Sequence, residues 1–160
     1  MDPAAKKQAL RLLTYGLYVL TAAQGNERAA GTVNWLTQAS FAPPLLAAGV
    51  KVDSHLWPLI QRSGHLAVNI LSASQKDMAQ DFFRPTRVEG DRINGHAFVP
   101  GGSGGAPLLT EVPAWLEATV LETVQRGDHA LVVAEVVGAG VRDGAAKPLE
   151  MWDTGWFYGG

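Results

Sequence analysis

Two long strand-like segments joined by a short turn constrain the fold more than any other feature. Residues 114–125 read AWLEATVLETVQ and residues 129–141 read HALVVAEVVGAGV, with the turn Arg126-Gly127-Asp128 between them. The second segment is apolar on both faces, which is typical of a strand inside a closed barrel or under a helix. In the first segment, apolar and polar residues alternate along the chain. Its alternation predicts one face with Leu116, Ala118, Val120 and Val124, and the other with Glu117, Thr119 and Thr123.

Shorter apolar and β-branched segments predict the remaining strands at residues 15–23, 29–35, 43–52, 65–71, 96–100 and 155–159. Helices are expected at residues 3–13, 54–62 and 74–83, the first capped by Asp2 with Pro3 at its first position. Residues 34–44 are interpreted as a turn, and the rest of 84–113 as irregular. Hairpin-linked strands without regular helices between them predict a mainly β protein, an antiparallel β-barrel with a few short helices.

The composition narrows the range of functions. The 160 residues are expected to form a single domain, 1–160. A net charge of -2 argues against charge-driven nucleic-acid binding. No segment approaches the ~20 apolar residues of a membrane-spanning helix. The absence of cysteine excludes disulfides and thiolate chemistry and fits a cytoplasmic protein. The four histidines show no paired spacing, so we expect no metal site.

Three features are candidates for a binding site. The segment NWLTQASFAPP, residues 34–44, combines hydrogen-bonding side chains with two flat aromatic rings, a composition suited to a planar heterocycle. Ser54 at the start of a predicted helix, with Lys51 upstream, offers an anion site; the alternative is a plain N-cap beside a surface lysine. His129 is either a structurally satisfied histidine at a strand edge or a group directed at a ligand.

Taken in order, several segments make the chain similar to the flavin reductase-like family, whose fold is the FMN-binding split barrel. The resemblance covers most of the chain and is closest to flavoredoxin-like proteins and rubredoxin-associated flavin reductase modules. It rests on the segments TYGLYVLTA, GTVNWLTQASFAPP, SHLWPLIQRSGHLAVNIL, QKDMAQDFF, RGDHALVVAEVV and GWFYGG. It implies that the antiparallel barrel is split and of Greek-key type.

The resemblance also implies a set of site residues. Contacts with the flavin ring and ribityl chain are implied for Thr32, Val33, Asn34, Trp35, Thr37, Gln38, Ala39 and Ser40. Phosphate contacts are implied for Lys51, Ser54 and His55, with Arg84 or Arg87 as a further partner. Trp156 and Tyr158 would flank the flavin, and His129 would be the catalytic residue beside the nicotinamide. The chain departs from many relatives at Leu56, where a threonine contacts phosphate.

The implied activity is NAD(P)H-dependent reduction of a flavin. The cofactor is expected to be FMN, with FAD as the alternative, and NADH or NADPH as the electron donor. The protein is expected to form a homodimer and to supply a monooxygenase or a redox protein. Two other hypotheses remain: an electron-transfer flavoprotein that holds FMN tightly and reacts poorly with NAD(P)H, and a barrel that has lost the cofactor and only binds or supports a partner.

Overall fold

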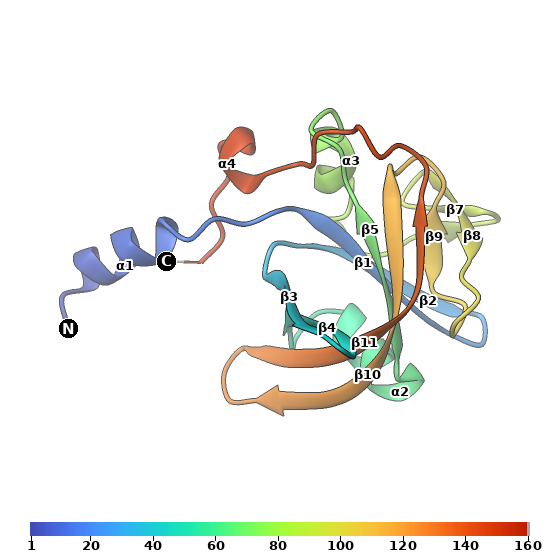
Figure 1. The fold of residues 1–160 in the computed structure, drawn as a ribbon, viewed down its shortest axis with the longest axis horizontal. Helices are drawn as coiled ribbons and strands as arrows, with labels where there is room; N and C mark the ends of the chain where they lie inside the picture. The colour runs from blue at the N-terminus through green and yellow to red at the C-terminus, as the bar shows by residue number, and fades with distance from the viewer. Residues whose placement is uncertain (160) are drawn as a thin grey trace.

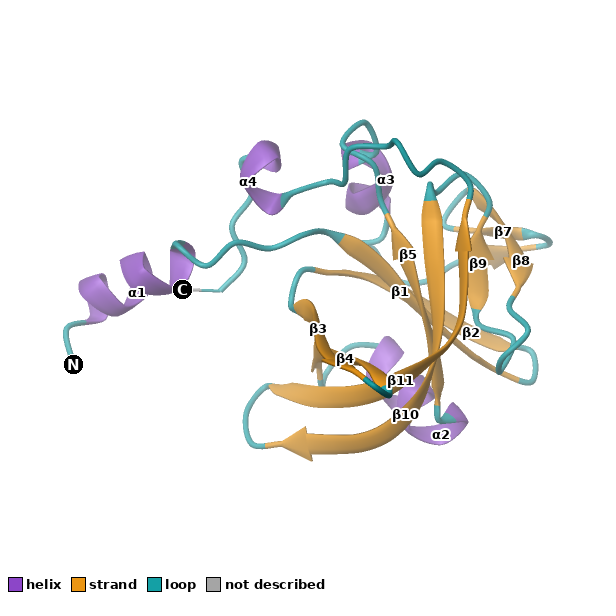
Figure 2. Cartoon of the chain, viewed as in Figure 1, coloured by secondary structure: helices purple, strands orange, loops and turns teal. Residues whose placement is uncertain are grey.

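The computed structural model describes residues 1–159, and its largest element is one curved antiparallel sheet (Figures 1 and 2). The sheet has seven strands in the order β2-β1-β5-β10-β11-β4-β3. They are β1 (Tyr18–Gln24), β2 (Glu27–Val33), β3 (Leu36–Phe41), β4 (Pro44–Lys51), β5 (His65–Ile70), β10 (Ala114–Gln125) and β11 (His129–Val141). The two end strands, β2 and β3, do not pair with each other in the described chain, so the barrel is split between them. The predicted fold class is confirmed.

The β10–β11 hairpin is the longest ladder of the sheet, and it contains two irregularities. Pairing runs from Ala114 opposite Val141 to Gln125 opposite Ala130, with register shifts after Glu117 and after Val120. The first shift leaves an extra residue in β11, and the second leaves Leu121 as an extra residue in β10, which reverses the alternation of β10 beyond it. The predicted faces of β10 are wrong at two positions. Val124 lies beyond Leu121 and is 38% exposed. Glu117 precedes both shifts, is only 5% exposed, and accepts the backbone N–H of Ser103 at 2.7 Å with its carboxylate.

The two faces of β11 differ in burial. Ala130, Val132 and Ala134 lie in the barrel interior and are almost completely buried. On the other face, Leu131 and Val137 are 45% and 51% exposed. The prediction that both faces would be covered is therefore wrong for the outer face, which remains an apolar surface.

Residues 84–113 contain more structure than the sequence indicated. A second, four-stranded sheet is built from β6 (Val88–Glu89), β7 (Arg92–Ile93), β8 (His96–Pro100) and β9 (Pro107–Leu109). Only β8 was predicted, because strands of two or three residues are too short to show an alternating pattern. The side chains of Ile93, Phe98 and Leu109 from this sheet are buried against the main sheet in a second core cluster.

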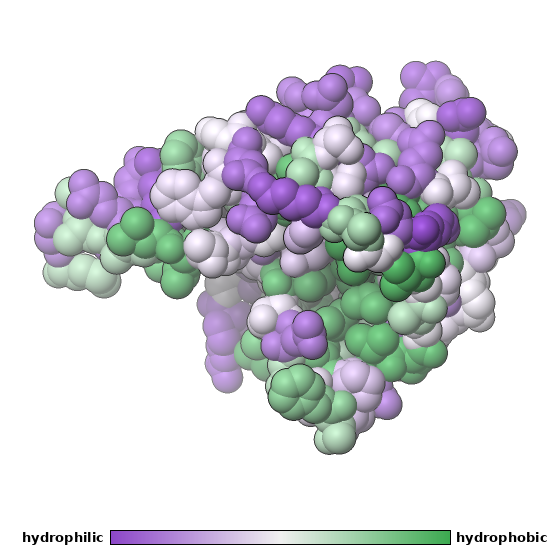
Figure 3. All heavy atoms as spheres, turned by 45° about the horizontal axis from the view of Figure 1, so that its top comes forward, coloured by the Kyte–Doolittle hydropathy of each residue, from purple (hydrophilic) through white to green (hydrophobic). Residues whose placement is uncertain are grey.

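Four helices accompany the sheets in the described chain: α1 (Pro3–Arg11), α2 (Leu56–Ser63), α3 (Lys76–Asp81) and α4 (Met151–Thr154). The first three were predicted with slightly different bounds, whereas α4 was not. Helix α1 has no buried residue and projects from the body of the molecule (Figures 1 and 3). None of the helices among residues 1–159 is long and apolar enough to cross a membrane.

The barrel interior is filled by side chains from the inner faces of the strands and from α2. Leu59 and Ile60 of α2 are completely buried against Leu20, Val68 and Val132. Burial of each such side chain stabilises the fold by about 1.5–3 kcal/mol. This packing fixes the start of α2 relative to the end of β4, which is one end of the site described below.

Two segments differ from their predicted structure. Residues 36–41 form strand β3 and not a turn, pairing with β4 from Leu36 opposite Ala48 to Phe41 opposite Pro44. As an edge strand with exposed side chains it lacks the apolar pattern of an interior strand. Residues 155–159 were predicted to form a strand, but they are irregular. Gly155 there has φ 74°, a left-handed conformation that ends α4.

Candidate functional site

A large cleft lies at the split in the barrel. Its volume is about 620 Å³, within the roughly 300–1,000 Å³ range of small-molecule sites. The first wall is the end of β2. The second wall is formed by the end of β4, the start of β11 and the start of α2. The third wall is formed by residues 82–86, which follow α3. The lining residues are Leu17, Ala30, Gly31, Thr32, Val33, Asn34, Gly49, Val50, Lys51, Ser54, His55, Leu56, Phe82, Phe83, Arg84, Pro85, Thr86, His129, Met151, Trp156, Phe157 and Tyr158.

The free edge of β2 holds the third wall in place. The Thr86 hydroxyl lies 2.9 Å from the backbone nitrogen of Ala30 and 3.2 Å from its carbonyl oxygen. The Thr32 hydroxyl donates to the carbonyl of Ala79 at 2.6 Å, and its backbone N–H donates to the carbonyl of Phe82 at 3.4 Å. Edge groups that would otherwise lack partners therefore fix residues 82–86 along the cleft.

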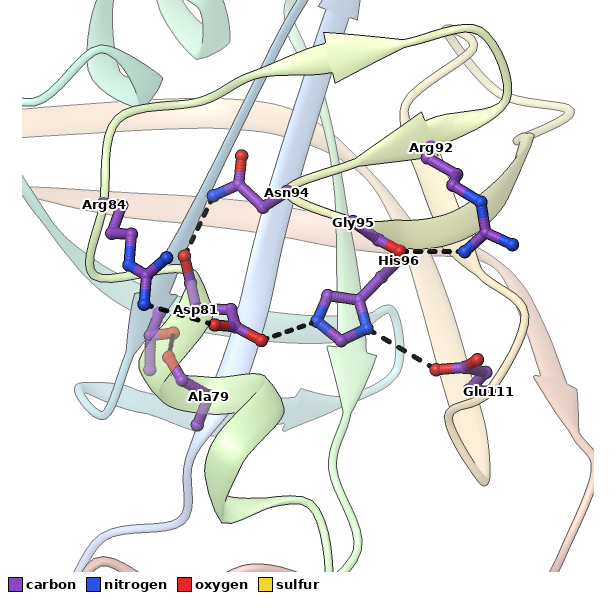
Figure 4. A network of polar contacts seen from close by, with 9 residues as sticks. Ala79, Asp81, Arg84, Arg92, Asn94, Gly95, His96 and Glu111 are labelled. Atoms are coloured by element: carbon purple, nitrogen blue, oxygen red, sulfur yellow. Dashed lines mark hydrogen bonds and ion pairs between the residues drawn. The ribbon is translucent and has the colours of Figure 1, made fainter.

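The small sheet supports the same wall through His96 (Figure 4). One imidazole nitrogen of His96 lies 3.0 Å from the carboxylate of Asp81, and the other lies 3.5 Å from that of Glu111. The amide of Asn94 donates to the backbone carbonyl of Asp81 at 3.0 Å. These contacts anchor the end of α3, from which the cleft residues Phe82 and Phe83 follow directly.

The two candidate arginines differ in position. Arg84 lines the cleft, and its guanidinium lies 3.7 Å from the carboxylate of Asp81. Arg87 is outside the lining and pairs with Glu89 in the small sheet. Arg84 is thus the cationic side chain that this wall offers to a ligand.

At the opposite wall, the end of β4 leads into α2. The Ser54 hydroxyl donates to the carbonyl of Lys51 at 2.7 Å and accepts the backbone N–H of Trp57 at 3.3 Å. Ser54 therefore caps the helix, although the helix itself begins at Leu56. Lys51 is half exposed and lies 3.3 Å from Asp53. The side chain of Leu56 is buried in the barrel core, so it contributes only apolar surface to the cleft.

His129, the first residue of β11, uses both ring nitrogens. Its Nδ1 lies 2.9 Å from the carboxylate of Asp128, and its Nε2 lies 2.8 Å from the hydroxyl of Tyr158. Because a carboxylate only accepts, Nδ1 carries the proton, and in neutral imidazole Nε2 then accepts the hydroxyl proton of Tyr158. The hydrogen bond and charge of His129 lower the pKa of Asp128, and burial raises the pKa of Tyr158.

The indole ring of Trp35 packs against the imidazole ring of His129. The two rings have centroids 4.5 Å apart, and the ring of Tyr158 stands edge-on to Trp35 at 5.4 Å. Trp35 packs so closely on Gly49 of β4 that a Cβ there would come within 3.1 Å of it. The indole nitrogen of Trp35 is buried without a hydrogen-bond partner among the described residues. Next to it, Asn34 is buried, and its amide donates to the sulfur of Met151 at 3.1 Å.

The cleft brings together ten of the fifteen predicted site residues. They are Thr32, Val33, Asn34, Lys51, Ser54, His55, Arg84, His129, Trp156 and Tyr158. Trp35 lies behind His129 and outside the lining. Thr37, Gln38, Ala39 and Ser40 also lie outside it, because β3 runs away from the cleft as an edge strand whose side chains are largely exposed.

Several residues that line the cleft were not predicted from the sequence to be site residues. Phe82, Phe83, Thr86, Met151 and Phe157 all line it. The consecutive pair Phe82-Phe83 after a predicted helix was the one available signal. Thr86 is held at the cleft by its hydrogen bonds to Ala30 of β2, and Met151 belongs to α4, which was not predicted.

A split antiparallel barrel with a cleft at its open edge defines the class of protein. The sequence model of the flavin reductase like domain matches residues 10–159. The chain belongs to the flavin reductase-like family, as predicted.

Individual relatives support this assignment. A probable flavin reductase of Rhizobium meliloti (strain 1021) is 29% identical over 84% of this chain and 42% of its own length. The flavin reductase (NADH) of Kitasatospora aureofaciens is 32% identical over 71% of this chain and 58% of its own. The chain thus spans about half the length of these curated relatives.

Solved structures give the same result. The NADH:FAD oxidoreductase of Streptomyces globisporus C-1027 superposes with a TM-score of 0.79 and 27% identity, covering 94% of this chain and 85% of that chain. The styrene monooxygenase flavin reductase of Pseudomonas putida S12 superposes with a TM-score of 0.78 and 29% identity, covering 97% and 96%.

The contact between Asp128 and His129 predicts a measurable titration. The carboxyl of Asp128 should titrate below its ordinary value of 3.8, because His129 stabilises the charged form. The stabilisation that this carboxylate provides is then present above 3.8 and is lost as pH falls through the lowered pKa. In His129→Ala the midpoint should return towards 3.8, which NMR of the Asp128 side chain measures. A wild-type midpoint at or above 3.8 would contradict the contact.

Proposed function

We propose that this protein is an NAD(P)H-dependent flavin reductase that binds FMN in the cleft at the split of the barrel, with FAD as the alternative flavin. The observation that carries the proposal is the cleft itself. In one space it joins apolar walls, cationic groups at Arg84 and Lys51, and the oriented imidazole of His129. A flavin needs all three: flat apolar contact for its ring, positive charge for its phosphate, and polar groups at the reacting edge.

The residues present fit such a cofactor. Val33 and Phe83 supply apolar surface on two of the walls, and the backbone of β2 beside Gly31 has no side chain to obstruct a ring. The first turn of α2 offers backbone N–H groups to a phosphate without requiring net charge. The Ser54 hydroxyl donates to the carbonyl of Lys51 and would have to turn from it to donate to a phosphate. Leu56 cannot contact phosphate, so Lys51, Ser54, His55 and Arg84 would take over the role of the threonine found in many relatives.

When bound, the flavin would supply the hydride-accepting chemistry. The protein's part is binding, orientation and electrostatics. Asp128 holds His129 in one tautomer with Nε2 facing the cleft, and Trp35 limits the tilt of the imidazole ring. From this position the Nε2 acceptor of His129 would hold and orient the nicotinamide. No side chain needs to act as a covalent nucleophile.

The acceptor of the electrons is proposed from the relatives. One similar structure is the flavin reductase component of a bacterial two-component tryptophan halogenase, and another is a styrene monooxygenase flavin reductase. We propose that this protein likewise delivers reduced flavin or electrons to a monooxygenase or redox protein, in the cytoplasm. The second candidate is an electron-transfer flavoprotein, favoured by 33% identity to a putative diflavin flavoprotein of Synechocystis sp. (strain ATCC 27184 / PCC 6803 / Kazusa), of which the chain covers 24%.

The role of His129 is tested by His129→Ala. We expect hydride transfer from NADH to bound FMN to slow about 3- to 10-fold, the loss typical of one hydrogen bond between neutral groups. Stopped-flow absorbance without oxygen measures the rate. Arg126→Ala is the matched control, because Arg126 lies in the same turn, is exposed and lies outside the cleft. An unchanged rate in His129→Ala, with FMN bound, would show that the histidine has no such role.

The phosphate assignment is tested by comparing two arginines. Arg84→Gln should weaken FMN binding roughly 3- to 10-fold, a modest effect because the side chain is largely exposed, and should leave riboflavin binding unchanged. Arg87→Gln should leave both affinities unchanged, since Arg87 pairs outside the cleft. Fluorescence titration gives the dissociation constants. Equal losses for FMN and riboflavin in Arg84→Gln would refute a phosphate contact.

We also propose that the protein is a homodimer that covers the outer face of β11. Leu131 is opposite Gly49 and Val124 in the two neighbouring strands, so these residues share one face. Trp35 packs on Gly49, which makes this apolar face continuous with the His129 end of the cleft. A second copy of the chain, docked through the same face, would bury the apolar face of both copies.

Replacing one apolar residue with a charge tests this interface. Leu131→Glu should shift the protein towards monomer, because a charge at a buried interface lacks a partner. Val99→Glu, at a similarly exposed valine on β8 in the small sheet, is the control. Sedimentation velocity measures both. A dimer of unchanged stability in Leu131→Glu would place the interface elsewhere.

A further inference from the structure

The residues that follow α4 cross the mouth of the cleft from one wall to the other. Trp156 contacts the third wall, with its ring edge-on to Phe83 at 5.0 Å and the ammonium of Lys76 over it at 5.0 Å. Two residues later, Tyr158 contacts the opposite wall at His129 and Trp35. We call residues 155–159 the crossing segment. It covers the cleft without filling it, because the volume of about 620 Å³ remains beneath it.

The crossing segment is held by side-chain contacts at its two ends. It contains no regular structure, and within the described chain residues 157–159 make no backbone hydrogen bond. Gly155 and Gly159 at its ends have φ 74° and 81°, conformations that favour glycine. Phe157 in its middle is 61% exposed. Such a segment can leave the cleft at a lower free-energy cost than a strand paired in a sheet.

Tyr158 occupies the one group of His129 that a ligand would need. With Nδ1 committed to Asp128, Nε2 is the remaining acceptor, and the Tyr158 hydroxyl already donates to it at 2.8 Å. An incoming ligand that uses this nitrogen must therefore carry a donor and must displace Tyr158. A nicotinamide has this chemistry: its carboxamide supplies N–H donors, and its flat six-membered ring matches the phenol ring packed edge-on to Trp35.

We propose that Tyr158 occupies the place on His129 that the nicotinamide would take. The pyridine nucleotide must therefore displace the crossing segment before hydride transfer. The inference rests on the proposed function and makes Tyr158 a specificity-determining residue for it. Ligands without a donor for Nε2 leave the segment in place. Flavin binding does not require displacement, since the space for it lies beneath the segment. The raised pKa of Tyr158 keeps its hydroxyl protonated, and therefore a donor, at neutral pH.

Removal of the Tyr158 hydroxyl tests whether Tyr158 competes with the nicotinamide for His129. Tyr158→Phe keeps the ring and loses the hydroxyl, so KM for NADH should fall about 3- to 10-fold, the value of one hydrogen bond, while the dissociation constant of FMN stays unchanged. Trp152→Ala is the control, because Trp152 is an exposed aromatic of α4 outside the cleft. An unchanged or raised KM in Tyr158→Phe would overturn the proposal, as would a weakened affinity for FMN.

A second measurement detects displacement without turnover. Chymotrypsin cleaves after the aromatic residues of the crossing segment when they leave the cleft. Addition of NAD⁺ to the FMN-loaded wild-type protein should accelerate this cleavage, and Tyr158→Phe should be cleaved faster than wild type without NAD⁺. Equal cleavage with and without NAD⁺ would overturn the proposal. Failure of the proposed function would look different, because NADH would then reduce FMN in neither wild type nor Tyr158→Phe.

Discussion

The unpaired edge of β2 is the constraint on which the rest of the site depends. A strand at a sheet edge carries backbone groups that need partners, and in a split barrel the neighbouring strand is missing. Here Thr86 and the carbonyl of Phe82 supply those partners at Ala30 and Thr32. The same hydrogen bonds bring Phe83 and Arg84 to face the ends of β4 and β11. The cleft is therefore a direct consequence of leaving the barrel open at this point.

The charged and polar groups of the opposite wall come together because His129 is the first residue of β11. The turn places Asp128 beside it, and the pairing of β11 with β4 places it opposite Lys51. The anionic neighbour, the cationic neighbour and the imidazole thus come from two adjacent strand ends. Trp35 closes this group from behind because Gly49 leaves room for its ring. Strand pairing fixes the backbone of the histidine, and contacts with Asp128 and Tyr158 fix the orientation of its ring.

The parts of the fold that were predicted are those in which local sequence decides the structure. The β10–β11 hairpin shows long apolar runs around a turn, and α2 begins at a recognisable serine cap. Strand β3 was missed because an edge strand tolerates the polar residues Thr37 and Gln38. The contacts that shape the site join distant residues: Tyr158 meets His129 across 29 positions, and Asn34 meets Met151 across 117. No local pattern encodes such pairs, and the separation of Arg84 in the cleft from Arg87 beside Glu89 is likewise a result of the tertiary structure.

The central claim is that this cleft binds a flavin that NADH or NADPH can reduce. The most direct measurement is the visible absorbance of the purified protein loaded with FMN, recorded without oxygen before and after NADH is added, with NADPH in a parallel sample. We expect the added FMN to bind the protein and its yellow absorbance to be lost on addition of the reduced nucleotide. A protein that binds no FMN, or whose bound FMN stays oxidised with both nucleotides, would contradict this claim.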